Sequence, residues 1–331
     1  MSLIPAQLGA ALVEATRHPL ALLESHAAPL QSVITSLAQG QAVTETQLLA
    51  AVGGADTLRR STGILELSQG RGGRDIAVLH LHGIALYNFE FPGLAYSTRM
   101  LAHTIKQLAA DSSLGGIILD ISSPGGVVTG IEEAADAIYA ARQVKSIVAV
   151  VNPMAASAAY WIASQASTLA IVPSGDVGSI GVFYLHLSLA ESMKMAGVEP
   201  TYIFAGERKI DANFLEPLSD RARDHLQGEV DTTYALFTEH VARGRGVSVS
   251  TARGPLFGEG NTVMAREAVR VGLADRLATV EEEIGRMASA AGGAKSSPRR
   301  ATKKAAGRRL SETNEQKRAR LNRRLALERK I

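Results

Sequence analysis

Short, continuous apolar runs alternate with segments of helical periodicity through the middle of this chain. The runs cover residues 76–81, 117–121, 147–151 and 168–172, and the segments 96–110, 130–142 and 157–167 between them have apolar residues at helical spacing. Strands that are apolar throughout are buried on both faces, and parallel strands need a crossover segment between them. The pattern therefore predicts an α/β fold with a mainly parallel sheet covered on both faces.

Apolar periodicity also predicts helices and strands after residue 180, and a loop and a change of charge divide the chain into three parts. It predicts helices over 187–196, 219–243, 265–271 and 279–288, and strands over 199–204 and 274–278. A glycine-rich loop at 69–73 predicts a boundary. We expect an N-terminal helical extension at 1–70, a core at 71–290 and a basic tail at 291–331.

Charge is distributed unevenly between the core and the tail. The net charge of the 331 residues is +3, but residues 291–331 hold 14 Lys/Arg and 3 Glu, which leaves 21 basic and 29 acidic residues in 1–290. Two interpretations stay open: a solvated tail that is disordered or helical, and a docking arm for an acidic protein partner or nucleic acid. No aromatic residue lies among these charges, which weakens the nucleic-acid interpretation.

Composition excludes several kinds of chemistry. The chain has no cysteine, which excludes disulfides, thiolate metal sites and a cysteine nucleophile. We expect neither a cofactor nor a metal. Residues 1–40 have no basic start followed by a long apolar stretch, so we expect no signal peptide, no membrane span and a cytoplasmic location.

Two predicted strands end in sequences suited to catalysis, and the carboxyl ends of strands are where α/β proteins place their sites. Ser123-Pro124-Gly125-Gly126 follows the run at 117–121, and its glycines leave backbone N–H groups open to a substrate carbonyl, as in an oxyanion hole. Ser157 lies between the run at 147–151 and an alanine-rich helix. A serine there is ordinarily a helix cap, but the helix N-terminus also favours developing negative charge.

A serine nucleophile needs a base. His186 and Lys209 follow Ser157 at 29 and 52 residues. A lysine serves when burial leaves its amine neutral. Most lysines are solvated and most histidines beside apolar strands are structural, and the residues alone leave both candidates open.

Four ordered motifs carry a resemblance to a known family: Ser-Pro-Gly-Gly at 123–126, Ala-Ala-Ser-Ala-Ala-Tyr-Trp at 155–161, Gly-Ser-Ile-Gly-Val at 178–182 and Ala-Gly-Glu-Arg-Lys-Ile-Asp at 205–211. Over residues 75–280 the chain resembles the signal peptide peptidase A family of serine peptidases (family S49), relatives of Clp protease. The resemblance implies a crotonase-like ββα superhelix and a closed homo-oligomeric ring in which neighbouring subunits help to build each active site.

The resemblance also implies roles for individual residues. Ser157 would be the nucleophile, Lys209 its base, and Ser179 the group that holds the lysine amine. The backbone N–H groups of Gly126, beside Gly125, and of Ala158 would form the oxyanion hole. This chain has Ile210 between Lys209 and Asp211, which displaces the aspartate of the family segment by one residue. His186 remains the second choice of base, in a Clp-like triad.

Among members of the family, the chain most resembles capsid maturation proteases of tailed phages and prophages. Their protein substrates are scaffold, portal or coat proteins inside a prohead, and the basic tail would dock on capsid or scaffold proteins. The alternative is a cytosolic bacterial peptidase that degrades signal peptides or misfolded peptides. A crotonase-like acyl-CoA enzyme and a non-catalytic assembly protein are alternatives of another class, against which the presence of both Ser157 and Lys209 argues.

Overall fold

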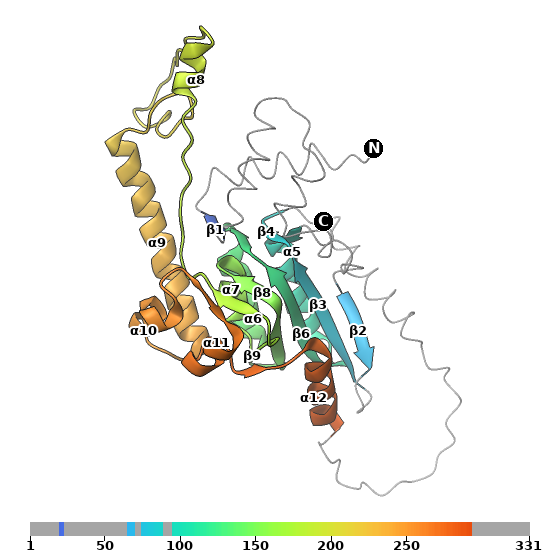
Figure 1. The fold of residues 1–331 in the computed structure, drawn as a ribbon. Coiled ribbons are helices and arrows are strands. Elements are labelled where there is room, and N and C mark those ends of the chain that lie inside the picture. The colour runs from blue at the N-terminus through green and yellow to red at the C-terminus, as the bar shows by residue number, and fades with distance from the viewer. Residues whose placement is uncertain (1–19, 23–64, 70–73, 89–94, 293–331) are drawn as a thin grey trace, which may run out of the picture.

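The fold is built on an eight-stranded, mainly parallel sheet (Figure 1). The computed structural model describes residues 20–22, 65–69, 74–88 and 95–292. The strands of this main sheet are β2 (Leu65–Gln69), β3 (Asp75–His82), β6 (Leu114–Ser123), β8 (Ile147–Ala156), β9 (Thr168–Ile171), β10 (Asp176–Gly178), β11 (Thr262–Met264) and β12 (Arg276–Leu277). The α/β class and the mainly parallel sheet predicted from the sequence are confirmed.

The strand order places the central strands β3, β6 and β8 side by side in parallel. The first half of β8 pairs with β9 and its last three residues with β10, both in parallel. β2 pairs antiparallel with β3 and β11 antiparallel with β10, at the two ends of the main strand order, and β12 pairs parallel with β9 on the side branch. β2 lies before the boundary expected at residue 70, yet it belongs to the main sheet.

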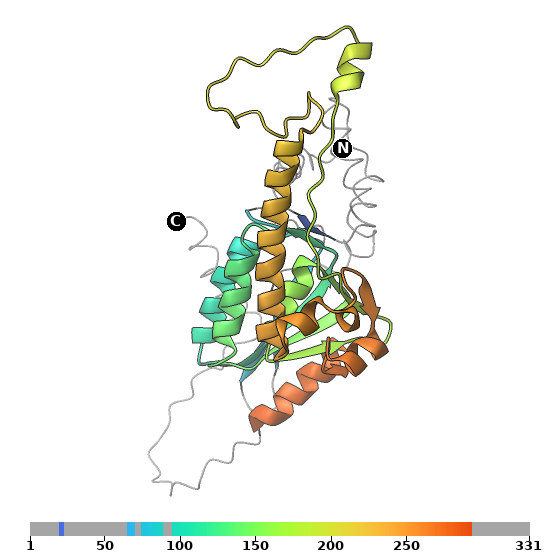
Figure 2. The ribbon, with the colours of Figure 1, turned by 90° about the vertical axis from the view of Figure 1, so that its left-hand side faces the viewer.

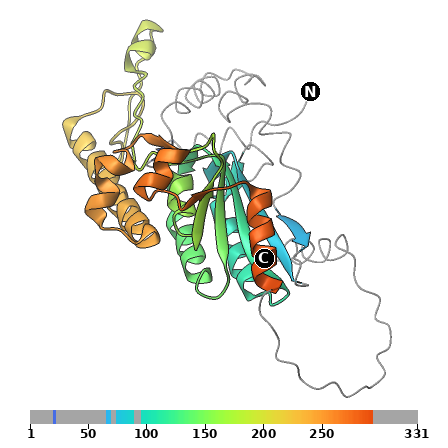
Figure 3. The ribbon, with the colours of Figure 1, turned by 60° about the horizontal axis from the view of Figure 1, so that its bottom comes forward.

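Helices cover both faces of the main sheet (Figure 3). On one face, α5 (Thr98–Ala110), α6 (Ile131–Ala141) and α7 (Ala158–Ala163) pack against Leu79, Ile117 and Ile121. On the other face, Met287 and Ala288 of α12 (Val280–Gly292) pack against alternate residues of the same strands, such as Ile118. Because successive side chains of a strand point to opposite faces of the sheet, the core has two layers, one on each face.

A second, four-stranded sheet adjoins the end of the main sheet. Its order is β1 (Leu20–Leu22), β7 (Gly125–Val127), β4 (Ile84–Leu86) and β5 (Ala95–Ser97). β7 follows directly after β6, so this small sheet begins where the central strand ends. β1 pairs antiparallel with β7, and Ala21 lies opposite Gly126.

Residues 183–219, here called the arm, extend away from the sheets (Figures 1 and 2). The arm contains α8 (Ala190–Met195), and none of its residues is fully buried. The chain returns to the core along α9 (Asp220–Arg245), whose last turns bury Phe237 and Val241. The short helices α10 (Val249–Arg253), η1 (Pro255–Phe257) and α11 (Ala265–Val271) follow.

Three predictions from the sequence need correction, and two other regions lie outside the described residues. The segment 199–204 is not a strand, the helix expected at 187–196 begins only at Ala190, and the helix expected at 157–167 spans Ala158–Ala163. The N-terminal extension, apart from β1 and β2, and the tail from residue 293 lie outside the part that the structure describes.

Candidate active site

Ser157 occupies a sharp corner between β8 and α7. Its backbone has φ 52° and ψ −120°, a conformation that non-glycine residues rarely adopt. The corner is fixed on both sides: the Ser157 N–H donates to the Gly178 carbonyl at 2.8 Å, and its carbonyl accepts from the Trp161 N–H at 2.9 Å. Such a strained strand-to-helix turn is the backbone arrangement of a nucleophile elbow.

The hydroxyl of Ser157 does not cap the helix. Although Ser157 holds the N-cap position of α7, its side chain makes no capping hydrogen bond. The hydroxyl instead donates to the Gly181 carbonyl at 3.3 Å, and the residue is 1% exposed. The first N–H groups of α7, including that of Ala158, have no partner within the helix. Ser157 is therefore not a helix-capping serine, which is the ordinary role of a serine at this position.

Gly125 and Gly126 lie at the same end of the sheet as Ser157. Ser123 of β6 is paired with Ala155 of β8, so two residues further along each strand the chain reaches Gly125 and Ser157. A Cβ on Gly126 would stand 2.1 Å from the Ala85 carbonyl oxygen, which leaves glycine as the residue that fits. β7 thus brings its backbone close to the serine corner without side chains at these two positions.

Ser179 lies beside Ser157. Gly178 of β10 is paired with Ala156 of β8, and the next residue in each chain segment is a serine. Ser179 is 6% exposed, has a φ of 51°, and its N–H donates to the Asn261 carbonyl at 2.8 Å. The structure therefore brings together Ser157, Ser179, Gly125, Gly126 and Ala158.

Lys209 is not part of this group within one chain. It lies exposed in a turn of the arm, where its N–H donates to the Gly206 carbonyl at 3.0 Å. Among the described residues, no hydrogen bond or ion pair joins its side chain to Ser157. His186 also lies in the arm, and its Nε2 is 3.1 Å from the Asn213 carbonyl oxygen, a contact that joins the two limbs of the arm.

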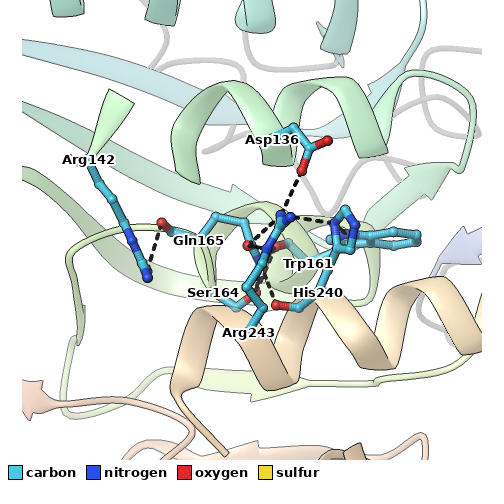
Figure 4. Close-up of polar contacts among 7 residues, drawn as sticks. All are labelled: Asp136, Arg142, Trp161, Ser164, Gln165, His240 and Arg243. Atoms are coloured by element: carbon cyan, nitrogen blue, oxygen red, sulfur yellow. Dashed lines mark hydrogen bonds and ion pairs between the residues drawn. The ribbon is translucent and has the colours of Figure 1, made fainter. Parts of the chain in front are cut away.

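A polar cluster around Trp161 and Arg243 anchors α7 to α9 (Figure 4). The Trp161 indole N–H donates to His240 Nδ1 at 2.9 Å, and Arg243 reaches the Gln165 side chain at 3.0 Å and Asp136 at 2.7 Å. Burial, followed by the charge of Arg243, lowers the pKa of His240, which favours the neutral imidazole that can accept the hydrogen bond from the indole N–H. The C-terminal end of α9 is thus fixed to α7, the helix that follows the serine corner.

Arg142, the C-cap residue of α6, completes this cluster. Its guanidinium donates to the carbonyls of Gln165, Ala166 and Gly244, and it stacks over the Tyr139 ring at 4.0 Å. A Cβ on Gly244 would stand 2.2 Å from the Ser164 carbonyl oxygen, so α9 approaches this turn closely. No sequence motif marks this cluster, because its members are up to 107 residues apart and have no regular spacing. The one signal was Trp161, the single tryptophan of the chain.

One group of side chains has the composition of a metal site. In the described part of the chain, this group consists of His80, His82 and Asp120, whose potential donor atoms lie close enough to hold one metal ion. They lie on the face of the main sheet that α12 covers, since they alternate in step with Val78 and Ile118.

No helix of the described residues is both long and apolar enough to span a bilayer.

The fold and site define an α/β protein with a serine elbow beside a glycine-lined strand. Residues 139–293 match the sequence model of peptidase family S49. This match agrees with the family that the four motifs predicted.

Curated relatives agree with this assignment. The chain is 35% identical to head-tail preconnector protein GP5 of Enterobacteria phage P21, over 65% of this chain and 43% of that protein. It is 31% identical to capsid assembly protease C of Escherichia phage lambda, over 76% and 57%. It is 28% identical to putative protease MJ0651 of Methanocaldococcus jannaschii, over 64% and 70%. The chain spans about half the length of the two phage proteins that it matches.

Proposed function

We propose that the chain is a serine endopeptidase in which Ser157 is the nucleophile and Lys209 is its base. The observation that carries this proposal is the backbone of Ser157, a buried non-glycine residue held at φ 52° and ψ −120° with its hydroxyl free of any capping role. Strain of this kind costs about 1–3 kcal/mol and persists where the surrounding structure imposes it, commonly at active sites. The match of residues 139–293 to the sequence model of peptidase family S49 supports the same conclusion.

The chemistry follows from these groups. The neutral amine of Lys209 takes the proton from the Ser157 hydroxyl as the oxygen attacks the substrate carbonyl, and Ser179 orients the amine. The N–H groups of Gly126 and Ala158, with Gly125 keeping the approach open, stabilise the oxyanion. The lysine returns its proton to the leaving amine as the peptide C–N bond breaks. Water, deprotonated by the same lysine, then hydrolyses the acyl ester and restores the serine.

The pairing of β1 with β7 supports a peptide as the substrate. β1 lies antiparallel along β7, with Ala21 opposite Gly126, so this edge accepts an extended backbone next to the proposed oxyanion hole. An extended peptide binds a strand edge in the same way, with main-chain hydrogen bonds for affinity and side-chain pockets for specificity. Small, apolar surroundings such as Val127 favour small or apolar side chains at the cleaved position.

The position of Lys209 supports an active site shared between copies of the chain. The arm that carries Lys209 exposes several large apolar side chains: Met195 (82% exposed), Val198 (51%), Ile203 (99%), Phe204 (48%) and Phe214 (55%). Exposed apolar groups gathered on one segment mark an interaction surface. Burial of this surface against a second copy would remove the nearby lysine from water, and desolvation favours the neutral amine that a base requires.

The names of two relatives support a proposal about the substrates. Capsid assembly protease C of phage lambda and head-tail preconnector protein GP5 of phage P21 are named for capsid assembly and the head-tail connection. We therefore propose scaffold, portal or coat proteins of a prohead as substrates, with the basic tail at 291–331 as a docking arm for them. If the chain is encoded by a phage, it would act in the host cytoplasm or in the prohead interior.

Cleavage of an unfolded protein such as casein by the purified full-length chain tests this function. A fluorophosphonate probe should label Ser157 in the wild type, and Ser157→Ala should reduce cleavage by about 10⁴-fold or more. The matched control is Ser289→Ala, because Ser289 is an exposed serine of α12 that donates to the Gly285 carbonyl. Cleavage by Ser157→Ala at the wild-type rate would show that another residue is the nucleophile.

A further inference from the structure

Two histidines and an aspartate form a cluster at the carboxyl end of the main sheet, separate from the serine corner. His80 and His82 alternate along β3 and so project from one face, and His80 is paired with Asp120 of β6. His80 Nδ1 is 2.8 Å from Asp120 Oδ2, and His82 Nε2 is 3.1 Å from the same oxygen. Both imidazoles therefore converge on one carboxylate oxygen.

The carboxylate is held in place from a third strand. The side-chain amide of Asn152 in β8 donates to Asp120 Oδ1 at 3.2 Å, which leaves Oδ2 facing the histidines. Asp120 is 5% exposed and His82 6%. Burial alone would raise the pKa of Asp120, but the hydrogen bonds and charges of His80 and His82 outweigh it and hold that pKa well below the ordinary value. A second contact that orients a carboxylate in this way is typical of metal ligands.

The donor set fits a divalent transition metal. Two imidazole nitrogens and one carboxylate oxygen are ligands of zinc and its neighbours in the first transition series. The three donor atoms lie within 4.8 Å of one another. Donors in a tetrahedral zinc site stand about 3.3 Å apart, given bond lengths of about 2.0–2.1 Å, so a small outward movement of the rings makes room for the ion.

We propose that His80, His82 and Asp120 bind one divalent transition-metal ion, with zinc as the best fit, in a structural site. The ion joins the carboxyl ends of β3 and β6, and Asn152 connects it to β8. Asp120 lies three residues before Ser123 and Asn152 five residues before Ser157, so the site fixes the strand ends from which both halves of the proposed catalytic centre start. The alternating His-Leu-His at 80–82 is the signal in the sequence, although its first two residues also belong to the apolar run at 76–81.

Zinc binding to the full-length, untagged chain tests this site. After treatment with a chelator, the protein is titrated with zinc chloride by calorimetry, and its melting temperature is measured with and without zinc. We expect one zinc ion per chain and a higher melting temperature with zinc, because the ion binds the native state. His82→Gln and Asp120→Asn should each weaken binding at least about tenfold and lose the thermal shift.

The matched control is His103→Gln, since His103 is an exposed histidine of α5; it should bind zinc as the wild type does. Binding of less than about a tenth of an equivalent by the wild type would overturn the proposal, as would equal affinity in His82→Gln. If the variants do not fold, cobalt replaces zinc in the wild type. A visible absorption band of four-coordinate cobalt supports the site, and no band contradicts it.

Discussion

Ser157 and Ser179 are the first residues after two paired parallel strands, and both have a left-handed backbone. Ala156 is paired with Gly178, the Ser157 N–H donates to the Gly178 carbonyl at 2.8 Å, and the φ angles of the two serines are 52° and 51°. Each such residue costs about 1–3 kcal/mol of strain. Two strained serines side by side at the carboxyl ends of strands point to a site that the rest of the fold holds in place.

Ser157→Gly should unfold at a higher denaturant concentration than Ser157→Ala. Both variants lack the hydroxyl and should lose activity, but only glycine adopts φ 52° without strain. Relief of the strain stabilises the glycine variant, whereas the greater flexibility of glycine in the unfolded chain destabilises it. On balance we expect the free energy of unfolding of Ser157→Gly to be about 1 kcal/mol higher than that of Ser157→Ala. Urea titration measures it, and equal stability of the two variants would mean that the corner is not strained.

Gly126→Ala should damage both the local fold and catalysis. The added Cβ would stand 2.1 Å from the Ala85 carbonyl oxygen, so β7 must move away from β4 and take the Gly126 N–H with it. We expect a loss of about 10²-fold or more in turnover and about 1–3 kcal/mol in stability. Gly228→Ala is the control, since Gly228 lies on the exposed surface of α9 with open space around it. Full activity of Gly126→Ala would show that the Gly126 N–H is not part of the oxyanion hole.

His240 should make the chain less stable in mild acid. Burial, and then Arg243, lower its pKa in the folded state below the ordinary 6.5. As the pH falls below that value, the unfolded chain binds a proton before the folded chain does, so this contribution to stability is lost with falling pH. The proton would also remove the acceptor of the Trp161 indole, at 2.9 Å.

Replacement of His240 isolates this effect. His240→Gln should reduce the difference in unfolding free energy between pH 7.5 and pH 5.5, whereas His225→Gln, at an exposed position of α9, should leave it unchanged. Circular dichroism during thermal unfolding at the two pH values gives this comparison. An unchanged pH dependence in His240→Gln would assign the acid sensitivity to other groups.

The central sheet could be predicted from the sequence because its strands are apolar on both sides. The runs at 117–121 and 147–151 became β6 and β8, extended at both ends in β6 and at the carboxyl end in β8. The prediction at 199–204 failed for a physical reason. Thr201, Tyr202 and Ile203 have high strand propensity, but they lie in the arm, where no described strand lies beside them to complete a ladder.

The candidate site was predictable in part. Motif order identified Ser157, Ser179 and Gly126, and strand register explains why they meet. The same register cannot place Lys209, because a residue in an exposed arm is positioned by what the arm contacts rather than by the sheet. Strain at Ser157 and the cluster around Arg243 were also invisible in the sequence, since they depend on backbone angles and on contacts between distant segments.

The most direct test of the account is complementation between two inactive variants. Ser157→Ala and Lys209→Ala should each be inactive alone, with folded, assembled chains by circular dichroism and sedimentation. When equal amounts are unfolded and refolded together, Ser157 of one copy can meet Lys209 of another. If each site takes one residue from each of two neighbours, about a quarter of the sites in a random mixture are complete.

We therefore predict recovery of about a quarter of the activity of wild-type protein treated in the same way. Substantial activity of Lys209→Ala alone would contradict the assignment of the base. No recovery in the mixture, while refolded wild type is active, would contradict an active site shared between copies.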